Sequence, residues 1–167
     1  MRVISIDPGF DRVGVAILEQ INGSNPVLVF SECITTNKKD SFISRIFFVC
    51  QRVSEIIAEF NPSFFAIENL FFTTNKKTAM RVSEARGALL YISQVCNLIV
   101  YEYTPIEIKV AITGYGKATK EDIFFMTKKL IPILEKKEYG DDEIDAIAVG
   151  LTFFARYKID SLLSTKK

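Results

Sequence analysis

The amino-acid sequence predicts a single α/β domain in which a mixed five-stranded sheet is covered by helices on both faces. Three β-rich segments come first and are joined by short polar connections, which is typical of an antiparallel meander. Strand-like apolar runs then alternate with longer segments of helical periodicity, which is typical of parallel strands with crossover helices. No repeat or Pro/Gly-rich linker divides the chain, so we expect one domain over residues 1–157 and a short polar tail at 158–167.

The strands of the meander are predicted at 3–6, 13–18 and 26–34. The first is an apolar, β-rich run that stops at the turn-forming sequence Asp7-Pro8-Gly9, and it is expected to be buried on both faces. Polar residues around Asp11 and over 22–25 provide the two short connections.

The helices are placed by capping signals and by apolar periodicity. Ser41 is the expected N-cap of a helix that Asn61-Pro62 ends, and a fourth strand over 64–67 stops at Glu68. The elements that follow are a helix over 78–96, a strand over 98–101, a short helix over 105–112, a break at 114–116, a helix over 120–134 interrupted near Pro132, and a last helix over 142–157.

The composition excludes several classes of chemistry. The chain has 167 residues, 49% hydrophobic and 25% charged, so it can bury a core without a metal or a disulfide. Histidine is absent, which rules out an imidazole base, histidine ligands and a Ser–His or Cys–His pair. Cys33, Cys50 and Cys96 form no Cys-x-x-Cys motif and fit a reducing cytoplasm. No apolar run reaches the roughly 20 residues that span a membrane.

Four carboxylates stand where a sheet of this kind gathers its ligands. Asp7 and Glu68 each follow an apolar strand, and ligands of α/β sheets collect at the carboxyl ends of strands. Asp142 and Asp145 open the last predicted helix, and their spacing of three places them on one helix face. The opposite face of that helix is apolar and would pack on the sheet, so the four acids are expected to form one cluster.

Crowded carboxylates repel one another and take up protons unless cations lie between them. Hard divalent ions with oxygen ligands, chiefly Mg²⁺ or Mn²⁺, suit such a group. Two ions about 4 Å apart stabilise both sides of an in-line phosphoryl displacement, so the pattern indicates phosphodiester hydrolysis. Each acid taken alone also has a plainer interpretation, as a turn former or as a helix-capping charge, and only their joint placement favours a metal site.

Four stretches of the sequence resemble the RuvC family of crossover junction endodeoxyribonucleases, which has a ribonuclease-H-like fold. They are ISIDPG at 4–9, FAIENLF at 65–71, EARG at 84–87 and DEIDAIA at 142–148, in the family's order and approximate spacing. The resemblance implies a homodimeric, Mg²⁺-dependent nuclease with two ions in each active site, for which Mn²⁺ can substitute. Such enzymes resolve Holliday junctions, which are four-way DNA junctions, by paired nicks in strands of like polarity, in cooperation with a branch-migration motor.

The resemblance also implies the roles of the acids. The family's four catalytic acids, which hold the metal ions, map onto Asp7, Glu68, Asp142 and Asp145. Asp141 directly precedes the last motif, and the D-x-x-D register selects Asp142 in its place.

The DNA contacts are expected in the middle of the chain. Seven basic and three acidic residues lie between Thr73 and Lys120, although the whole chain carries a net charge of only +1. By the resemblance, Phe71 stacks on a base near the crossover, with its neighbour Phe72 left open as the alternative. Lys109 and Lys120 match lysines that contact DNA in the family. The full set of expected DNA-binding residues is Phe71, Lys76, Lys77, Arg81, Lys109, Lys117 and Lys120.

Gly87 lies inside the second long helix between Ala85 and Ala88, where small side chains allow another backbone to come close. The resemblance implies that a dimer forms through this helix. Close packing within one chain is the alternative explanation of the same residues.

Two other functions stay open at this point. The Asp7-x-Gly9 turn also occurs in actin-like phosphatases and sugar kinases, although this chain is short for their two-lobed form and lacks a second Gly-rich phosphate loop. The chain would instead be an inactive junction-binding protein if its metal ligands had been lost by substitution. The presence of all four acids argues against that.

Overall fold

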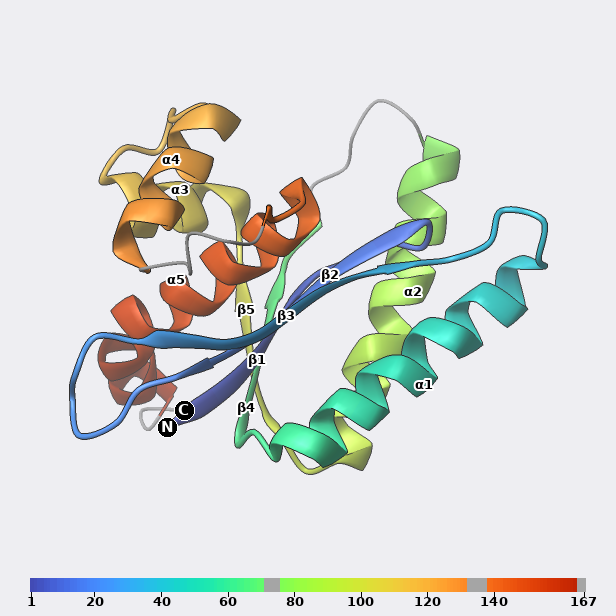
Figure 1. Cartoon of the computed structure of the whole chain (residues 1–167), viewed down its shortest axis with the longest axis horizontal. Helices are drawn as coiled ribbons and strands as arrows, with labels where there is room; N and C mark the ends of the chain where they lie inside the picture. The colour runs from blue at the N-terminus through green and yellow to red at the C-terminus, as the bar shows by residue number, and fades with distance from the viewer. Residues whose placement is uncertain (71–75, 132–137, 165–167) are drawn as a thin grey trace.

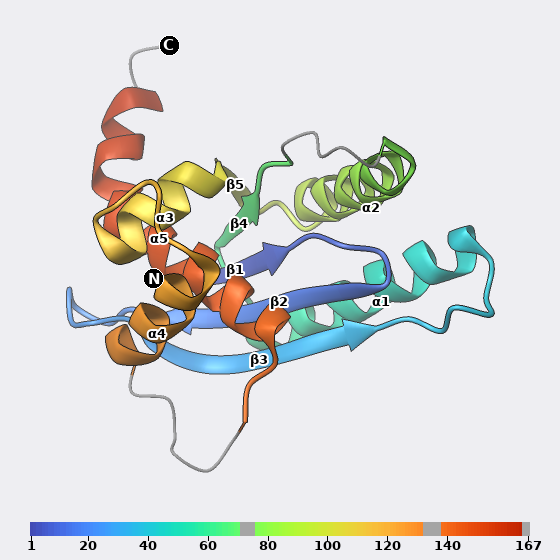
Figure 2. The ribbon, with the colours of Figure 1, turned by 90° about the horizontal axis from the view of Figure 1, so that it is seen from above.

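The computed structural model describes the backbone of residues 1–70, 76–131 and 138–164, and the side chains of these residues except 76–77 and 158–164. Over these residues the chain forms three layers, with one sheet between two layers of helices (Figure 1 and Figure 2). No helix in these ranges combines the length and the apolar character needed to cross a bilayer.

The sheet has the strand order β3-β2-β1-β4-β5. Its strands are β1 (Arg2–Asp7), β2 (Arg12–Glu19), β3 (Val27–Thr35), β4 (Phe64–Glu68) and β5 (Ile99–Tyr103). The first three strands pair in antiparallel fashion, whereas β4 and β5 continue the sheet parallel to β1. The predicted mixed five-stranded sheet is therefore confirmed.

Helices cover both faces of this sheet, as predicted (Figure 2). The helices α1 (Phe42–Phe60) and α2 (Lys76–Val95) lie on one face, and α3 (Pro105–Thr113), α4 (Lys120–Leu130) and α5 (Asp141–Ser164) lie on the other. The bounds of α1 follow from its caps. The Ser41 side chain accepts a hydrogen bond from the Ser44 N–H, and Asn61 ends the helix in the left-handed conformation with φ 46°.

The predicted ends of the last two helices have different outcomes. The helix α4 ends at Leu130, next to the interruption expected near Pro132, because Ile131 is extended (φ −115°, ψ 123°), as is typical of a residue that precedes a proline. Residues 132–134 of that predicted helix lie outside the described residues. The helix α5 runs to Ser164 rather than to Tyr157, since Ile159, Leu162 and Leu163 continue the apolar spacing of a helix into the segment expected to be a tail.

The core has two halves, one on each face of the sheet. In β1, Val3 packs in the half that contains α5, whereas Ile4 and Ile6 pack in the half that contains α1. The residues of β4 alternate in the same way. Because successive strand residues face opposite sides of a sheet, Asp7 and Glu68 continue the set that faces α5.

Two glycines let α5 lie close against the sheet. A Cβ on Gly14 would collide with the carbonyl oxygen of Asp142, and a Cβ on Gly150 would lie 2.5 Å from Leu18 Cδ1. The first turn of α5 therefore sits directly over β2, which brings the acids of that turn to the carboxyl end of β1.

Candidate active site

Asp7 and Glu68 end two neighbouring parallel strands. Ile6 pairs with Ile67 in the register of β1 and β4, so the two acids that follow are side by side at one edge of the sheet. Burial, followed by the charge of Glu68, raises the pKa of Asp7 to about 8. Burial, followed by the charge of Asp145, raises the pKa of Glu68 to about 7. The charge of Glu68 thus disfavours the ionised form of Asp7, and the charge of Asp145 disfavours that of Glu68.

Asp145 joins this pair from α5. Burial raises the pKa of Asp145 as well, although it forms an ion pair with Lys120, whose Nζ lies 3.1 Å from Oδ2. Thr119 caps α4 and places Lys120 at the first position of that helix. The charge of Lys120 also lowers the pKa values of Asp7 and Glu68 in part, so one ammonium group acts on three carboxylates.

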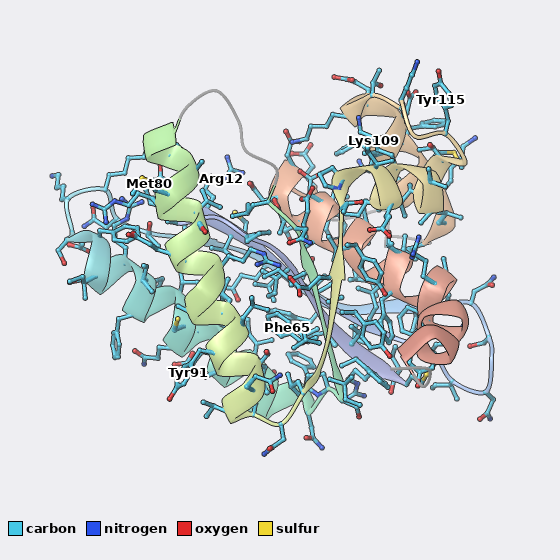
Figure 3. All side chains as sticks on the ribbon, turned by 180° about the vertical axis from the view of Figure 1, so that it is seen from behind. Arg12, Phe65, Met80, Tyr91, Lys109 and Tyr115 are labelled. Carbon is cyan, nitrogen blue, oxygen red and sulfur yellow. The ribbon has the colours of Figure 1, made fainter. Side chains whose placement is uncertain are left out.

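A small pocket lies between these groups. Its volume is about 180 Å³, and its polar lining comes from Glu68, Lys109, Lys120 and Asp145. Lys109 belongs to α3, which borders the site (Figure 3). The pocket therefore combines two acids with two of the lysines that the sequence assigns to DNA binding.

Asp142 lies at the margin of this group. Its carboxylate forms an ion pair with Arg12 and accepts a hydrogen bond from Cys33 Sγ at 3.6 Å. Its charge still contributes to the raised pKa of Asp7. In the ranges that the structure describes, no three Asp, Glu or Cys side chains form a ready-made metal-binding group.

The expected cluster thus needs an amendment. The four acids lie in one region, but their carboxylates do not converge on one point, because Asp142 faces Arg12 and Asp145 faces Lys120. Carboxylates that repel one another are stabilised by such counter-charges.

The donor chemistry of the site fits a hard divalent cation. The described donors are carboxylate oxygens on a half-buried edge of the sheet, with no imidazole in the chain, and Mg²⁺ and Mn²⁺ prefer such ligands. A divalent cation would also offset the burial and the repulsion that raise the pKa values of Asp7 and Glu68.

Arg86 holds the chain just beyond Glu68. Its guanidinium donates to the Glu68 carbonyl oxygen and to Asn69 Oδ1, both at 3.0 Å, and forms an ion pair with Glu102. Arg86 belongs to the EARG stretch and to the basic middle of the chain, but no contact could be predicted for it, because its partners become neighbours only when α2 packs beside β4 and β5.

Arg12 was also missed by sequence analysis. A signal was present, since Arg12 and Gly14 alternate with Val13 and Val15 in β2 and so face α5. The sequence alone does not show that α5 places Asp142 beside Arg12, because this depends on how the helix packs on the sheet.

The other predicted DNA-binding residues divide into three groups. Lys109 and Lys120 line the pocket. Arg81 lies on α2, stacked 3.9 Å from the centroid of the Phe42 ring and paired with Glu84, while Lys117 is exposed between α3 and α4. The remaining residues lie outside the described side chains, and these are Phe71, Phe72, Lys76 and Lys77.

The fold and the site together define a class of protein. The sheet order, the acids at the ends of β1 and β4, and a further acid on a helix packed across the sheet are those of a ribonuclease-H-like α/β fold. Residues 3–153 match the family described as Crossover junction endodeoxyribonuclease RuvC, and the chain belongs to this family.

Individual relatives agree with this assignment. The chain is 42% identical over 151 residues to the crossover junction endodeoxyribonuclease RuvC of Finegoldia magna, covering 90% of this chain and 91% of the relative. The structure of Thermus thermophilus RuvC superposes with a TM-score of 0.85 at 28% identity, covering 96% of this chain and 97% of the other. The T. thermophilus RuvC in complex with a Holliday junction substrate gives a TM-score of 0.85 at 29% identity, covering 95% and 96%.

The resemblance seen in four short stretches is therefore confirmed over nearly the whole chain, and so is the ribonuclease-H-like fold. Neither an inactive binding protein nor an actin-like phosphatase or kinase is favoured by these comparisons.

Proposed function

We propose that this chain is an endonuclease that resolves Holliday junctions by paired, symmetric nicks during DNA recombination and repair. The observation that carries this proposal is that Asp7, Glu68 and Asp145 lie close enough on the α5 side of the sheet for their charges to act on one another, in a member of the RuvC family. The reaction is hydrolysis of a phosphodiester bond that leaves a 5′-phosphate and a 3′-hydroxyl.

Mg²⁺ is the expected cofactor, two ions for each site, and Mn²⁺ is expected to substitute. Asp7, Glu68, Asp142 and Asp145 would hold it, since each offers carboxylate oxygens at the same end of the sheet. When bound there, a divalent cation supplies Lewis acidity and lowers the pKa of a coordinated water.

The lysines of the pocket bind the DNA backbone in this proposal. Lys109 and Lys120 line the same pocket as Glu68 and Asp145, so a phosphate held by their ammonium groups lies beside the carboxylates. Arg81, Lys117, Lys76 and Lys77 would contact the arms of the junction farther from the cut. Phe71 would stack on a base at the crossover, which contributes about 1–3 kcal/mol for each stacked base.

A homodimer gives two active sites for two cuts, and α2 is its proposed interface. A Cβ on Gly87 would meet no atom within 4 Å in the described part of the chain, so packing within one chain does not explain this glycine. Met80, Tyr91 and Val95 expose 65%, 69% and 57% of their surface on the same helix, and Figure 3 places Met80 and Tyr91 near its two ends. A second copy would cover these apolar side chains.

The proposed setting is the cytoplasm, where the enzyme acts with a branch-migration motor. The three cysteines are free, as expected in a reducing compartment. We also propose that residues 1–157 form one nuclease domain, beyond which α5 continues to Ser164.

A cleavage assay on a synthetic four-way junction with labelled strands tests the proposal. The wild-type chain should cut two strands symmetrically in Mg²⁺. Asp7→Asn and Glu68→Gln should each slow cutting by about 100-fold or more, since several kcal/mol of Lewis-acid stabilisation are lost, while junction binding in EDTA persists.

Full activity of either variant would contradict the role of the carboxylates. Tight junction binding without any cutting in Mg²⁺ or Mn²⁺ would instead identify an inactive binding protein.

A further inference from the structure

The first turn of α5 is held by a buried acid that does not line the pocket. Glu143 is 7% exposed and lies between Asp142 and Asp145 in the sequence. Ser31 Oγ donates to Glu143 Oε1 at 2.7 Å, and the Gly140 N–H donates to Glu143 Oε2 at 3.2 Å. Both carboxylate oxygens therefore have a donor.

Ser31 is a fixed anchor for this contact. It is 9% exposed and lies in β3 opposite Ala16 of β2, well inside the paired part of the hairpin. The bond from Ser31 thus ties the first turn of α5 to the sheet itself, while the bond from Gly140 ties the same carboxylate to the start of the helix.

Rotation of this turn would leave Glu143 buried without these partners. A buried charged group that loses its hydrogen bonds is strongly disfavoured, so the contacts with Ser31 and Gly140 fix the rotational setting of the helix. That setting decides where Asp142, one residue earlier, and Asp145, two residues later, project.

We propose that Glu143, anchored by Ser31, is a positioning residue of the active site, which orients Asp142 and Asp145 toward the metal-binding region beside Asp7 and Glu68. This inference rests on the proposed function, because it assigns Glu143 a role in preparing the same carboxylates. Residues that orient metal ligands typically change metal affinity or activity by about 10–100-fold when they are replaced.

Mn²⁺ binding to the full-length chain without DNA gives a test that is separate from activity. Titration calorimetry should show that Glu143→Ala and Ser31→Ala each weaken Mn²⁺ binding by about 10-fold or more. Glu143→Gln should stay nearer the wild type, because its amide oxygen can accept from the Gly140 N–H and its amide N–H can donate to Ser31 Oγ. Single-turnover cleavage should follow the same order, with junction affinity in EDTA unchanged.

Thr152→Val is the matched control. Thr152 is also buried on α5 but does not line the pocket, and its Oγ1 donates to the Ala148 carbonyl oxygen at 2.8 Å. This variant should lower the melting temperature and leave Mn²⁺ affinity and cleavage unchanged.

The inference is overturned if Ser31→Ala and Glu143→Ala lose stability as Thr152→Val does but keep wild-type Mn²⁺ affinity and cleavage. Ser31→Ala removes a single hydroxyl and keeps the test available if Glu143→Ala does not fold. Wild-type Mn²⁺ affinity and cleavage in these two variants would leave the proposed function intact. A wild-type chain that neither binds Mn²⁺ nor cuts junctions would overturn the proposed function together with this inference.

Discussion

At the scale of single residues, the site is a balance of charges. Burial and the charges of Glu68, Asp145 and Asp142 raise the pKa of Asp7, while the charge of Lys120 lowers it. Lys120 and Arg12 supply the counter-charges of Asp145 and Asp142. The carboxylates of this site therefore favour nearby cations, which are the side chains of Lys120 and Arg12 in the structure and a divalent ion in the proposed function.

The raised pKa of Asp7 predicts a pH-dependent stability in EDTA. Its value of about 8 in the folded chain lies above the ordinary value of 3.8, so the folded state retains a proton that the unfolded state has lost. Stability therefore falls as the pH rises from about 3.8 to about 8 and changes little above that. Asp7→Asn should raise the melting temperature by about 3 °C or more at pH 9 and much less at about pH 4.

Thermal unfolding at both pH values checks this, with the exposed residue Asp40 replaced in Asp40→Asn as the control. An Asp7→Asn variant that is no more stable than the wild type at pH 9 would contradict the raised pKa of this carboxylate.

The choice of Asp142 over Asp141 makes a second prediction at this scale. The side chain of Asp141 is 68% exposed and 3.7 Å from Lys120, whereas that of Asp142 is 23% exposed and influences Asp7. Asp141→Asn should keep junction cleavage within about threefold, because an exposed ion pair contributes little. Asp142→Asn should slow it by at least about tenfold. Single-turnover cleavage rates of the two variants test this choice. If Asp141→Asn slowed cleavage more than Asp142→Asn, Asp141 would be the catalytic acid in place of Asp142.

At the scale of helices and strands, the fit of α5 on the sheet places the acids. The glycines at 14 and 150 allow this close approach, and Ser31, Cys33 and Arg12 reach the first turn of the helix from β2 and β3. The hairpin of β2 and β3, which carries none of the four acids, thus contacts the helix turn that carries two of them.

Gly14→Ala should therefore disturb the site through the backbone. Its Cβ would collide with the Asp142 carbonyl oxygen, so we expect a loss of about 1–3 kcal/mol in the free energy of unfolding, measured by urea denaturation. Gly140→Ala is the control, because its Cβ would lie at ordinary contact distances, 3.8 Å from Glu143 Oε2 and 3.9 Å from Arg12 Nη2. Equal stabilities of the two variants would show that α5 can move away from β2 without cost.

Much of this architecture was predictable because the signals are local. Ser41 and Asn61 mark the ends of α1 correctly, and the apolar run before Asp7 marks β1. The extent of α5 was missed because its last two turns, residues 158–164, were interpreted as part of a polar tail.

The candidate site was predictable only in part. Asp7 and Glu68 could be expected to lie close together, because the carboxyl ends of neighbouring parallel strands lie at the same end of the sheet. The pairing of Arg12 with Asp142 and of Ser31 with Glu143 depends on where α5 crosses the sheet, which no local pattern specifies.

At the scale of the whole molecule, the two helical layers have different tasks. The layer of α3, α4 and α5 builds the pocket and contributes Lys109 and Lys120, whereas α2 in the opposite layer exposes apolar side chains around Gly87 (Figure 3). Cutting and dimerisation are thus assigned to opposite faces of one sheet.

Tyr91→Arg should dissociate the proposed dimer, because a charge would replace an apolar contact at its interface. Tyr115→Arg is a matched control, since Tyr115 is 60% exposed and Tyr91 69%, but Tyr115 lies beside α3, away from α2 (Figure 3). Light scattering coupled to size-exclusion chromatography gives the mass of each. A dimeric Tyr91→Arg variant that still makes paired nicks would exclude α2 as the interface.

The most direct test of the metal-binding site is the anomalous scattering of Mn²⁺ in crystals of the full-length chain. We expect a peak about 2.0–2.3 Å from carboxylate oxygens of both Asp7 and Glu68, and its loss in Asp7→Asn. Crystals soaked in Mn²⁺ that show no peak between these two side chains, or a peak that persists unchanged in Asp7→Asn, would contradict the assignment of these carboxylates to a metal-dependent nuclease site.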